Sequence, residues 1–133
     1  MQNRSLISLV IPGGWLIVKN QFANEEPVIE NGKIANEEYF TEDLLSIERA
    51  IFKNGSWQND VNSYCLDVGW RPVADPNGAY YLTFFEKDWN NILFQVNSKD
   101  RDIIRKVIER CLDYSTRGLP DDEIKGKLSV EFI

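Results

Sequence analysis

The residue types that most often perform acid–base and nucleophilic catalysis are unevenly represented in this chain. Its 133 residues include no histidine, which excludes Ser-His-Asp and Cys-His arrangements and removes the commonest general base near neutral pH. A pair of carboxylates remains possible, because Asp67, Glu86 and Asp88 are the residue type that hydrolyses glycosidic bonds. In a chain with 21 acidic residues, however, such acids are mostly surface charge. We therefore expect a protein that is not an enzyme.

The sequence offers no binding motif for a cofactor or a metal ion. Cys65 and Cys111 are far apart, and without a CxxC pair or a histidine the usual zinc sites are excluded. Gly13-Gly14 lacks the lysine and the following helix of a phosphate-binding loop, so it indicates a turn. No stretch matches a calcium-binding loop. We expect no cofactor and two thiols that act as small buried hydrophobes, with a disulfide or a reactive cysteine as the alternative.

The negative charge is concentrated in one segment. The whole chain has a net charge of −6, and the segment from Glu25 to Asp43 alone sums to −6, so the rest of the chain is balanced. A nucleic-acid binder would instead show a basic stripe. A local acidic patch can steer a basic partner and accelerate its association, and the alternative is a loop that carries charge for solubility. The acidic residues of the segment are Glu25, Glu26, Glu30, Glu37, Glu38, Glu42 and Asp43.

Three consecutive antiparallel strands are predicted between residues 64 and 96. Two turn signals, Asp75-Pro76-Asn77-Gly78 and Asp88-Trp89-Asn90-Asn91, separate segments in which residues alternate with a period of two. One face of these strands is predicted to carry Leu66, Val68, Trp70, Tyr80, Leu82, Phe84, Ile92, Phe94 and Val96.

Helices are predicted at about residues 41–54 and 98–115. The second has apolar residues at helical spacing from Ile103 to Leu112, and the first has a stripe that includes Leu44, Ile47 and Ile51. Residues 6–11 and 15–18 suggest a hairpin that turns at Gly13-Gly14. Residues 128–133 alternate weakly and suggest an edge strand.

These elements predict a single α+β domain that spans residues 1–133. We expect a mostly antiparallel sheet of four to six strands, with the two main helices packed on one face. Residues 25–43 are expected to form a long loop or a short hairpin about Asn31-Gly32-Lys33. The chain shows no signal peptide and no apolar stretch as long as a transmembrane helix, so we expect a cytoplasmic protein that does not bind a membrane.

Aromatic residues gather on the second face of the predicted strands. Tyr81, Phe85 and Leu93 share that side, and Trp89 lies at the adjoining turn. A sheet face this apolar is either covered by the N-terminal hairpin or by loops, or it forms a protein interface in which Tyr, Trp and Phe act as anchors.

Several short motifs resemble those of bacterial immunity proteins, the small antitoxins encoded beside polymorphic or contact-dependent growth inhibition toxins. The resemblance extends over roughly residues 11–112 and does not identify a subfamily. The motifs are Ile11-Pro12-Gly13-Gly14-Trp15, Asn20-Gln21-Phe22 with Pro27, Glu42-Asp43-Leu44-Leu45, Asp67-Val68-Gly69-Trp70, Asp75-Pro76-Asn77-Gly78 and Asp88-Trp89.

This resemblance implies a non-enzymatic cytoplasmic protein that binds and neutralises a cognate toxin domain, often a nuclease. A nuclease has a basic cleft for phosphates, which an acidic protein can occupy. The alternatives are a small-ligand-binding domain or enzyme with an aromatic-lined pocket, and an oligomeric structural subunit. We expect partner contacts of two kinds: steering by Glu25, Glu26, Glu30, Glu37 and Glu38, and anchoring by Tyr81, Phe85 and Trp89.

Overall fold

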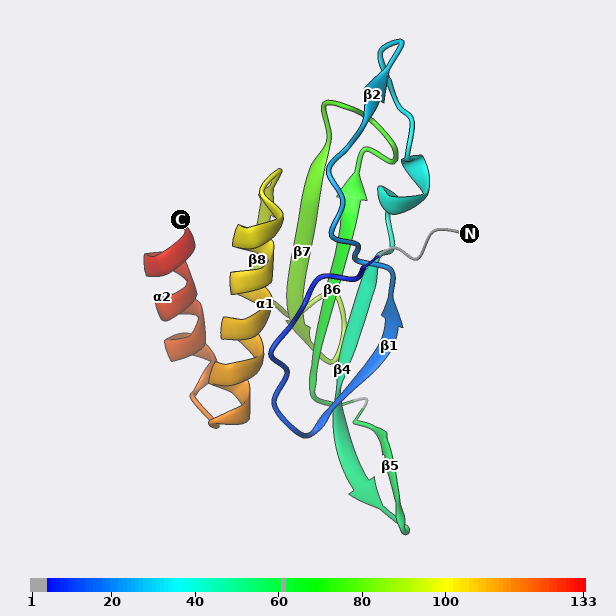
Figure 1. Cartoon of the computed structure of the whole chain (residues 1–133). Coiled ribbons are helices and arrows are strands. Elements are labelled where there is room, and N and C mark those ends of the chain that lie inside the picture. Colours follow the sequence, from blue (N-terminus) through cyan, green and yellow to red (C-terminus); the bar gives the residue numbers. More distant parts are fainter. Residues whose placement is uncertain (1–4, 61) are drawn as a thin grey trace.

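A computed structural model describes residues 5–60 and 62–133 and shows an α+β fold (Figure 1). The main sheet is antiparallel and has six strands in the order β1-β4-β6-β7-β8, with β5 paired to β4. Its strands are β1 (Trp15–Asn20), β4 (Leu45–Lys53), β5 (Ser56–Asn59), β6 (Tyr64–Arg71), β7 (Ala79–Glu86) and β8 (Ile92–Ser98). The other elements are β2 (Ile29–Glu30), β3 (Lys33–Ile34), the short 3-10 helix η1 (Glu37–Tyr39), and the helices α1 (Arg101–Thr116) and α2 (Asp121–Phe132).

The predicted run of three antiparallel strands is confirmed as β6, β7 and β8. Leu66 lies opposite Phe84, and Trp70 lies opposite Tyr80. These side chains are buried in one core cluster with apolar residues of both helices, among them Ile108. The face of β6 and β7 that was predicted to be apolar is therefore the face that the helices cover, and we call it the helix face.

A bulge in the β7–β8 pair corrects two residues of that prediction. Phe84 pairs with Phe94, but Phe85 pairs with Ile92, so Leu93 is the extra residue. Ile92 is consequently on the opposite face, where it is partly exposed, whereas Leu93 is buried in the core. The prediction that Leu93 shares a face with Tyr81 and Phe85 is therefore wrong.

The predicted helix at 98–115 is confirmed as α1. Its N-cap is Asp100, whose side chain accepts a hydrogen bond from the backbone N–H of Asp102. Ser98, two residues before the N-cap, accepts a hydrogen bond from the backbone N–H of Asp100. The apolar stripe of the helix, from Ile104 to Leu112, is fully buried.

The predicted helix at 41–54 is wrong, because residues 45–53 form strand β4 between β1 and β6. Leu45 and Ile47 are two residues apart and both are fully buried, so the apolar pattern also fits a strand with one buried face. The β-branched residues of this segment favour that alternative. Asn54 and Gly55 both have positive φ and form the turn from β4 into β5.

The predicted edge strand at 128–133 is also wrong, because residues 121–132 form α2. Three acidic residues, Asp121, Asp122 and Glu123, occupy its first turn and complement the positive end of the helix dipole. Ile124 and Leu128, four residues apart, are its buried residues. The weak alternation at 128–133 covers too few residues to indicate a strand, whereas the spacing of Ile124 and Leu128 fits a helix.

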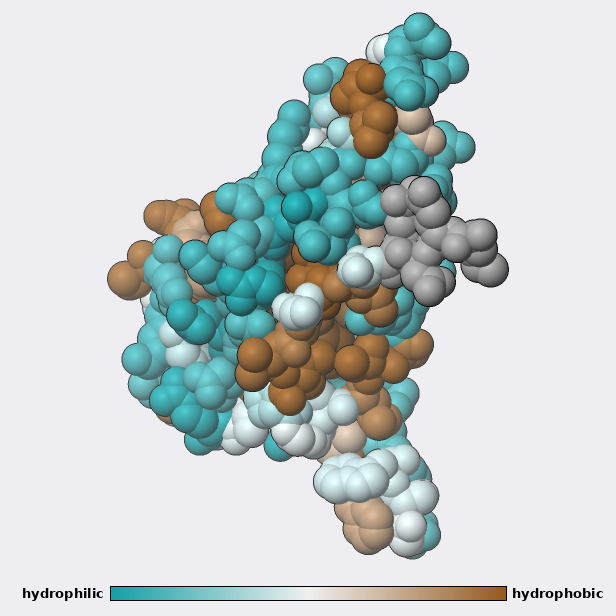
Figure 2. Space-filling model, viewed as in Figure 1, coloured by the Kyte–Doolittle hydropathy of each residue, from teal (hydrophilic) through white to brown (hydrophobic). Residues whose placement is uncertain are grey.

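The N-terminal segment covers the helix face instead of forming a hairpin with β1. Leu6 forms an isolated bridge with Ala23, and the backbone N–H of Val10 donates to Oε2 of Glu109 on α1 at 2.8 Å. Ile7, Leu9 and Ile11 pack against the core, while Leu6 and Val10 face solvent. Figure 2 shows the resulting apolar area over this segment and β1. The N-terminal segment therefore leaves the other face of the sheet uncovered.

The suggested short hairpin about Asn31-Gly32-Lys33 is present as β2 and β3, in which Glu30 pairs with Lys33. Figure 1 shows this hairpin and η1 at one end of the sheet, opposite the end at which the β4–β5 hairpin projects.

Candidate functional site

A row of polar side chains crosses the face of the sheet opposite the helices, which we call the open face. The strand register places Lys19, Ser46, Asp67, Thr83 and Gln95 side by side on β1, β4, β6, β7 and β8. Ser46 hydrogen-bonds Asp67, and Nε2 of Gln95 donates to Oγ1 of Thr83 at 3.3 Å. Such a row is unusual for a face that packs on another element.

The three predicted aromatic anchors all lie on the open face or at its edge. Tyr81 and Phe85 are on the same side of β7, and Trp89 in the following turn stacks on Phe85 with ring centroids 4.5 Å apart. Phe85 is only 6% exposed, whereas Trp89 is 51% exposed. The guanidinium of Arg71 lies over the ring of Tyr81 at 5.8 Å. Trp89 thus has a buried support beneath it and a free ring face that a partner can contact.

A groove of about 640 Å³ lies beside Trp89 on the open face. Its charged side chains come from three parts of the chain that only the fold brings together. The lining residues are Val18, Lys19, Glu42, Asp43, Ser46, Asp67, Arg71 and Trp89.

The groove has an excess of negative charge. It is lined by three carboxylates and two cationic side chains, and one of the cations is already used, because Nζ of Lys19 lies 3.2 Å from Oδ2 of Asp43. The ion pairs within residues 5–60 and 62–133 do not include Glu42 or Asp67. Glu42 and Asp67, which line the same groove as the exposed indole of Trp89, form none of these ion pairs, and Arg71 is the remaining cationic side chain of the lining.

The environment of Asp67 raises the pKa of its carboxyl group. Desolvation by burial is the main cause, and the negative charges of Asp43 and Glu48 add to it. The hydrogen bond from Ser46 and the charge of Arg71 act in the opposite direction but do not cancel the effect. A positive charge brought into the groove would favour the ionised form of Asp67 and would thus be attracted to it.

Cys65 lies next to Asp67 on β6 but is not activated. Burial, together with the charges of Glu48 and Asp67, raises the pKa of its thiol to about 11, so it stays protonated at neutral pH and is a poor nucleophile. Cys111 is completely buried, and burial raises the pKa of its thiol as well. Both cysteines are free; Cys111 is buried as predicted, whereas Cys65 is half-buried.

The five predicted steering glutamates do not line the groove. Glu26 forms an ion pair with Arg101 on α1 at 3.1 Å, Glu30 is on the β2–β3 hairpin, and Glu37 and Glu38 are in η1. Glu25 precedes Glu26 in the segment that leads to this hairpin. The acids that meet the aromatic anchors are instead Glu42, Asp43 and Asp67. Asp67 and its strand were recognisable from the sequence, but its neighbours depend on β4 being a strand.

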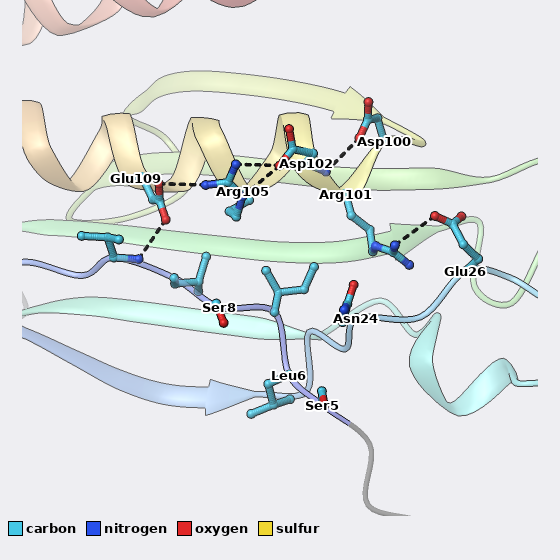
Figure 3. A pocket seen from close by; sticks show the side chains of 13 residues that line it. Ser5, Leu6, Ser8, Asn24, Glu26, Asp100, Arg101, Asp102, Arg105 and Glu109 are labelled. Carbon is cyan, nitrogen blue, oxygen red and sulfur yellow. Dashed lines mark hydrogen bonds and ion pairs between the residues drawn. The ribbon is translucent and has the colours of Figure 1, made fainter.

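A second hollow of about 710 Å³ separates the N-terminal segment from the start of α1 (Figure 3). Its charged side chains are joined to one another: Arg105 contacts Asp102 at 2.6 Å and Glu109 at 3.1 Å, and Arg101 contacts Glu26. The two contacts of Arg105 lie within α1. The Arg101–Glu26 ion pair joins α1 to the segment that precedes β2, and the backbone N–H of Val10 joins the N-terminal segment to Glu109. We interpret the hollow as a contact region between the N-terminal segment and α1, because its acidic and basic side chains mostly pair with one another; Nη1 of Arg101 is the buried atom of this lining that has no hydrogen-bond partner among the described residues.

In the part of the chain that the structure describes, no group of three or more Cys, Asp or Glu side chains could hold a metal ion, and no helix has the length and apolar character needed to cross a membrane. Comparison of the chain with protein-family models, with curated proteins and with solved structures finds no match.

Proposed function

We propose that this protein is a non-enzymatic immunity protein that binds a toxin domain through the open face of its sheet. The observation that carries the proposal is the groove that Glu42 and Asp67, both without ion pairs to the described residues, line together with the half-exposed ring of Trp89. The resemblance of the sequence motifs to bacterial immunity proteins supplies the class of partner.

The groove fits a basic side chain from a protein partner. The alkyl chain of a lysine or arginine can lie on the indole of Trp89, while its cationic head contacts Glu42 and Asp67. An aromatic anchor that rests on a buried ring is typical of the residues that dominate binding energy. The basic cleft of a nuclease toxin would supply such side chains, and covering that cleft would block its substrate.

The cytoplasm of the producing cell is the compartment that this role requires, because the toxin domain would act there. A contact-dependent growth inhibition system would give the protein this partner. Neutralisation by simple occlusion needs no cofactor and no catalytic residue. It needs an interface of about 800 Å² on each partner, of which the groove would be the centre.

Co-expression tests the proposal directly. The C-terminal domain encoded by the upstream neighbouring reading frame is expressed with and without this protein, and growth and binding are both measured. We expect growth arrest that is relieved only when the two proteins are present together. If the two do not bind, or if growth is not restored, the proposed function is wrong.

Substitutions in the groove test which surface is used. Trp89→Ala, and separately the double variant Glu42→Gln with Asp67→Asn, should each weaken binding by about 10- to 100-fold, as expected for central contacts. Val130→Ala is the control, because Val130 lies on α2 and is 88% exposed. Full binding by both groove variants would show that the partner is bound elsewhere.

A further inference from the structure

The β4–β5 hairpin extends beyond the sheet. β6 pairs with β4 only from Leu45 to Glu48, and β1 pairs with it only as far as Arg49. Among the described residues, the stretch from Ala50 to Lys53 pairs with β5 alone, apart from a hydrogen bond from the backbone N–H of Ala50 to the carbonyl of Gly14. Figures 1 and 2 show the hairpin projecting from the body of the protein. Its side chains therefore meet solvent on both faces.

The turn of this hairpin gives it a defined shape. Asn54 and Gly55 have φ values of 54° and 79°, which is the signature of a tight two-residue hairpin turn. Nε2 of Gln58 also donates a hydrogen bond to the carbonyl of Lys53 at 3.0 Å. The projection is thus an ordered element, and ordering it would add little to the cost of binding.

Two large aromatic residues near the turn are displayed to solvent. Phe52 and Trp57 are directly opposite each other on the two strands, their ring centroids are 5.5 Å apart, and each residue is 59% exposed. Cross-strand aromatic pairs stabilise hairpins, but that role does not require so much exposed surface. Together the two residues leave roughly 200–300 Å² of mainly apolar surface uncovered, given the size of such side chains.

This aromatic pair is on the same face as the groove. Side chains alternate along β4, so Ser46, Glu48 and Ala50 on the open face are followed on that face by Phe52. Trp57, as the cross-strand partner of Phe52, shares the face. Six residues of strand separate Ser46 in the groove from Phe52, which is about 20 Å. An interface of standard size, about 800 Å² per partner, spans that distance.

The hairpin also differs from the groove in charge. Residues 51–59 contain one lysine, Lys53, and no acid, whereas the groove has an excess of carboxylates. The two sites therefore fit different parts of a partner surface: a basic region for the groove, and an uncharged apolar pocket for the aromatic pair.

We propose that the β4–β5 hairpin is a second anchor for the same protein partner, with Phe52 and Trp57 inserted into an apolar pocket about 20 Å from the basic region that the groove binds. This inference rests on the proposed function, because it takes the partner of the open face as its occupant. A protein that makes both contacts at once is held by two separate points, which fixes its orientation on the sheet.

The test is to measure binding of the same toxin domain to the wild-type protein, to Phe52→Ala/Trp57→Ala and to Val130→Ala. The double variant should lose roughly 10- to 100-fold in affinity, mostly through faster dissociation, while the control remains at the wild-type value. The thermal unfolding of each variant is measured alongside, since a destabilised fold would also reduce binding. An unchanged dissociation rate in a folded double variant overturns this inference and leaves the proposed function intact.

Two other outcomes would contradict this inference for different reasons. If the wild-type protein does not bind the toxin domain, both the proposed function and this inference are wrong. If the free wild-type protein sediments as a dimer and the double variant as a monomer, the hairpin joins two copies of this chain, and the inference is overturned in favour of self-association.

Discussion

Gly69 allows the segment that carries Glu42, one of the acidic residues of the groove, to lie directly against β6. A Cβ at this position would overlap the carbonyl group of Glu42, so the chain that carries Glu42 crosses β6 in direct contact with its backbone. The backbone N–H of Trp70 donates to the carbonyl of Thr41, and that of Leu44 donates to the carbonyl of Val68. The position of Glu42 beside Asp67 thus depends on the absence of one side chain.

Gly69→Ala should therefore destabilise the protein by about 1–3 kcal/mol or more, because a buried backbone would have to move. Gly126→Ala is the matched control, since a Cβ at Gly126 in α2 would meet no atom within 4 Å. Replacing a glycine inside a helix should stabilise the protein by about 0.5–1 kcal/mol. Urea unfolding measures both effects, and equal stabilities for the two variants would contradict the close contact at Gly69.

The raised pKa of Asp67 predicts how stability depends on pH. The folded state binds more protons than the unfolded chain between the ordinary value of 3.8 and the raised value, so the carboxyl group lowers stability as pH rises through that window. In the Asp67→Asn variant the side chain cannot ionise, but its carbonyl oxygen can still accept the hydrogen bond from Ser46. It should be more stable than the wild type at pH 7, by a margin that shrinks toward pH 4.

This margin is measured by urea unfolding of both proteins at each pH. Because the two proteins share all other carboxyl groups, the titration of those groups contributes almost equally to both stabilities and largely cancels in the difference. A margin that does not change with pH would show that the pKa of Asp67 is not raised.

Some helices and strands of this fold can be predicted from the sequence alone, and others cannot. The segments 64–96 and 98–115 were predictable because their alternation and helical spacing are long and are bounded by strong turn and cap residues. Residues 45–53 were not, because Leu44, Ile47 and Ile51 fit a helical stripe as well as a strand, and only pairing with β1 and β6 decides between the two. Tertiary context overrode local propensity there.

The residues of the candidate site likewise divide into those whose proximity the sequence predicts and those whose proximity it does not. Tyr81, Phe85 and Trp89 were predictable as neighbours, because a strand and its turn place them together. The convergence of Glu42 and Asp43 with Asp67 was not, because it requires β4 to lie beside β6. Long-range pairing of this kind leaves no signal in a single sequence.

At the scale of the element, α2 is held by two buried side chains. Ile124 and Leu128 are fully buried, whereas Val130 is exposed. Leu128→Ala should cost about 2–5 kcal/mol in the free energy of unfolding, and Val130→Ala should stay within about 0.5 kcal/mol of the wild type. Urea denaturation followed by circular dichroism distinguishes them. Similar losses for both variants would show that α2 does not pack as described.

At the scale of the whole molecule, charge is distributed unevenly around a rigid sheet. The acidic segment from Glu25 to Asp43 contributes at two places: Glu42 and Asp43 line the groove, while Glu30, Glu37 and Glu38 lie beyond it at one end of the sheet. Charges outside a contact region act on the rate of encounter more than on the lifetime of a complex. We therefore expect Glu37 and Glu38 to affect the rate of association, and Glu42 and Asp43 to affect the lifetime of the complex.

Glu37→Gln/Glu38→Gln should therefore slow association with the proposed partner, a basic toxin domain, and weaken the salt dependence of that association, while dissociation stays unchanged. The matched control is Asp122→Asn/Glu123→Gln, which removes the same charge from the start of α2. Stopped-flow or surface-binding kinetics at several ionic strengths provide the measurement. Equal association rates for the two variants would assign a solubilising role to the acidic segment.

The four tryptophans form two contrasting pairs. Trp15 and Trp70 are buried, whereas Trp57 and Trp89 are more than half exposed, one on the projecting hairpin and one at the groove. Indole emission shifts to shorter wavelength when water is excluded from the ring, so a docked protein would change the spectrum at whichever of these two places it covers. In Trp57→Phe only Trp89 would remain as an exposed emitter, and in Trp89→Phe only Trp57 would remain. The molecule thus contains one label-free optical reporter for the groove and another for the hairpin.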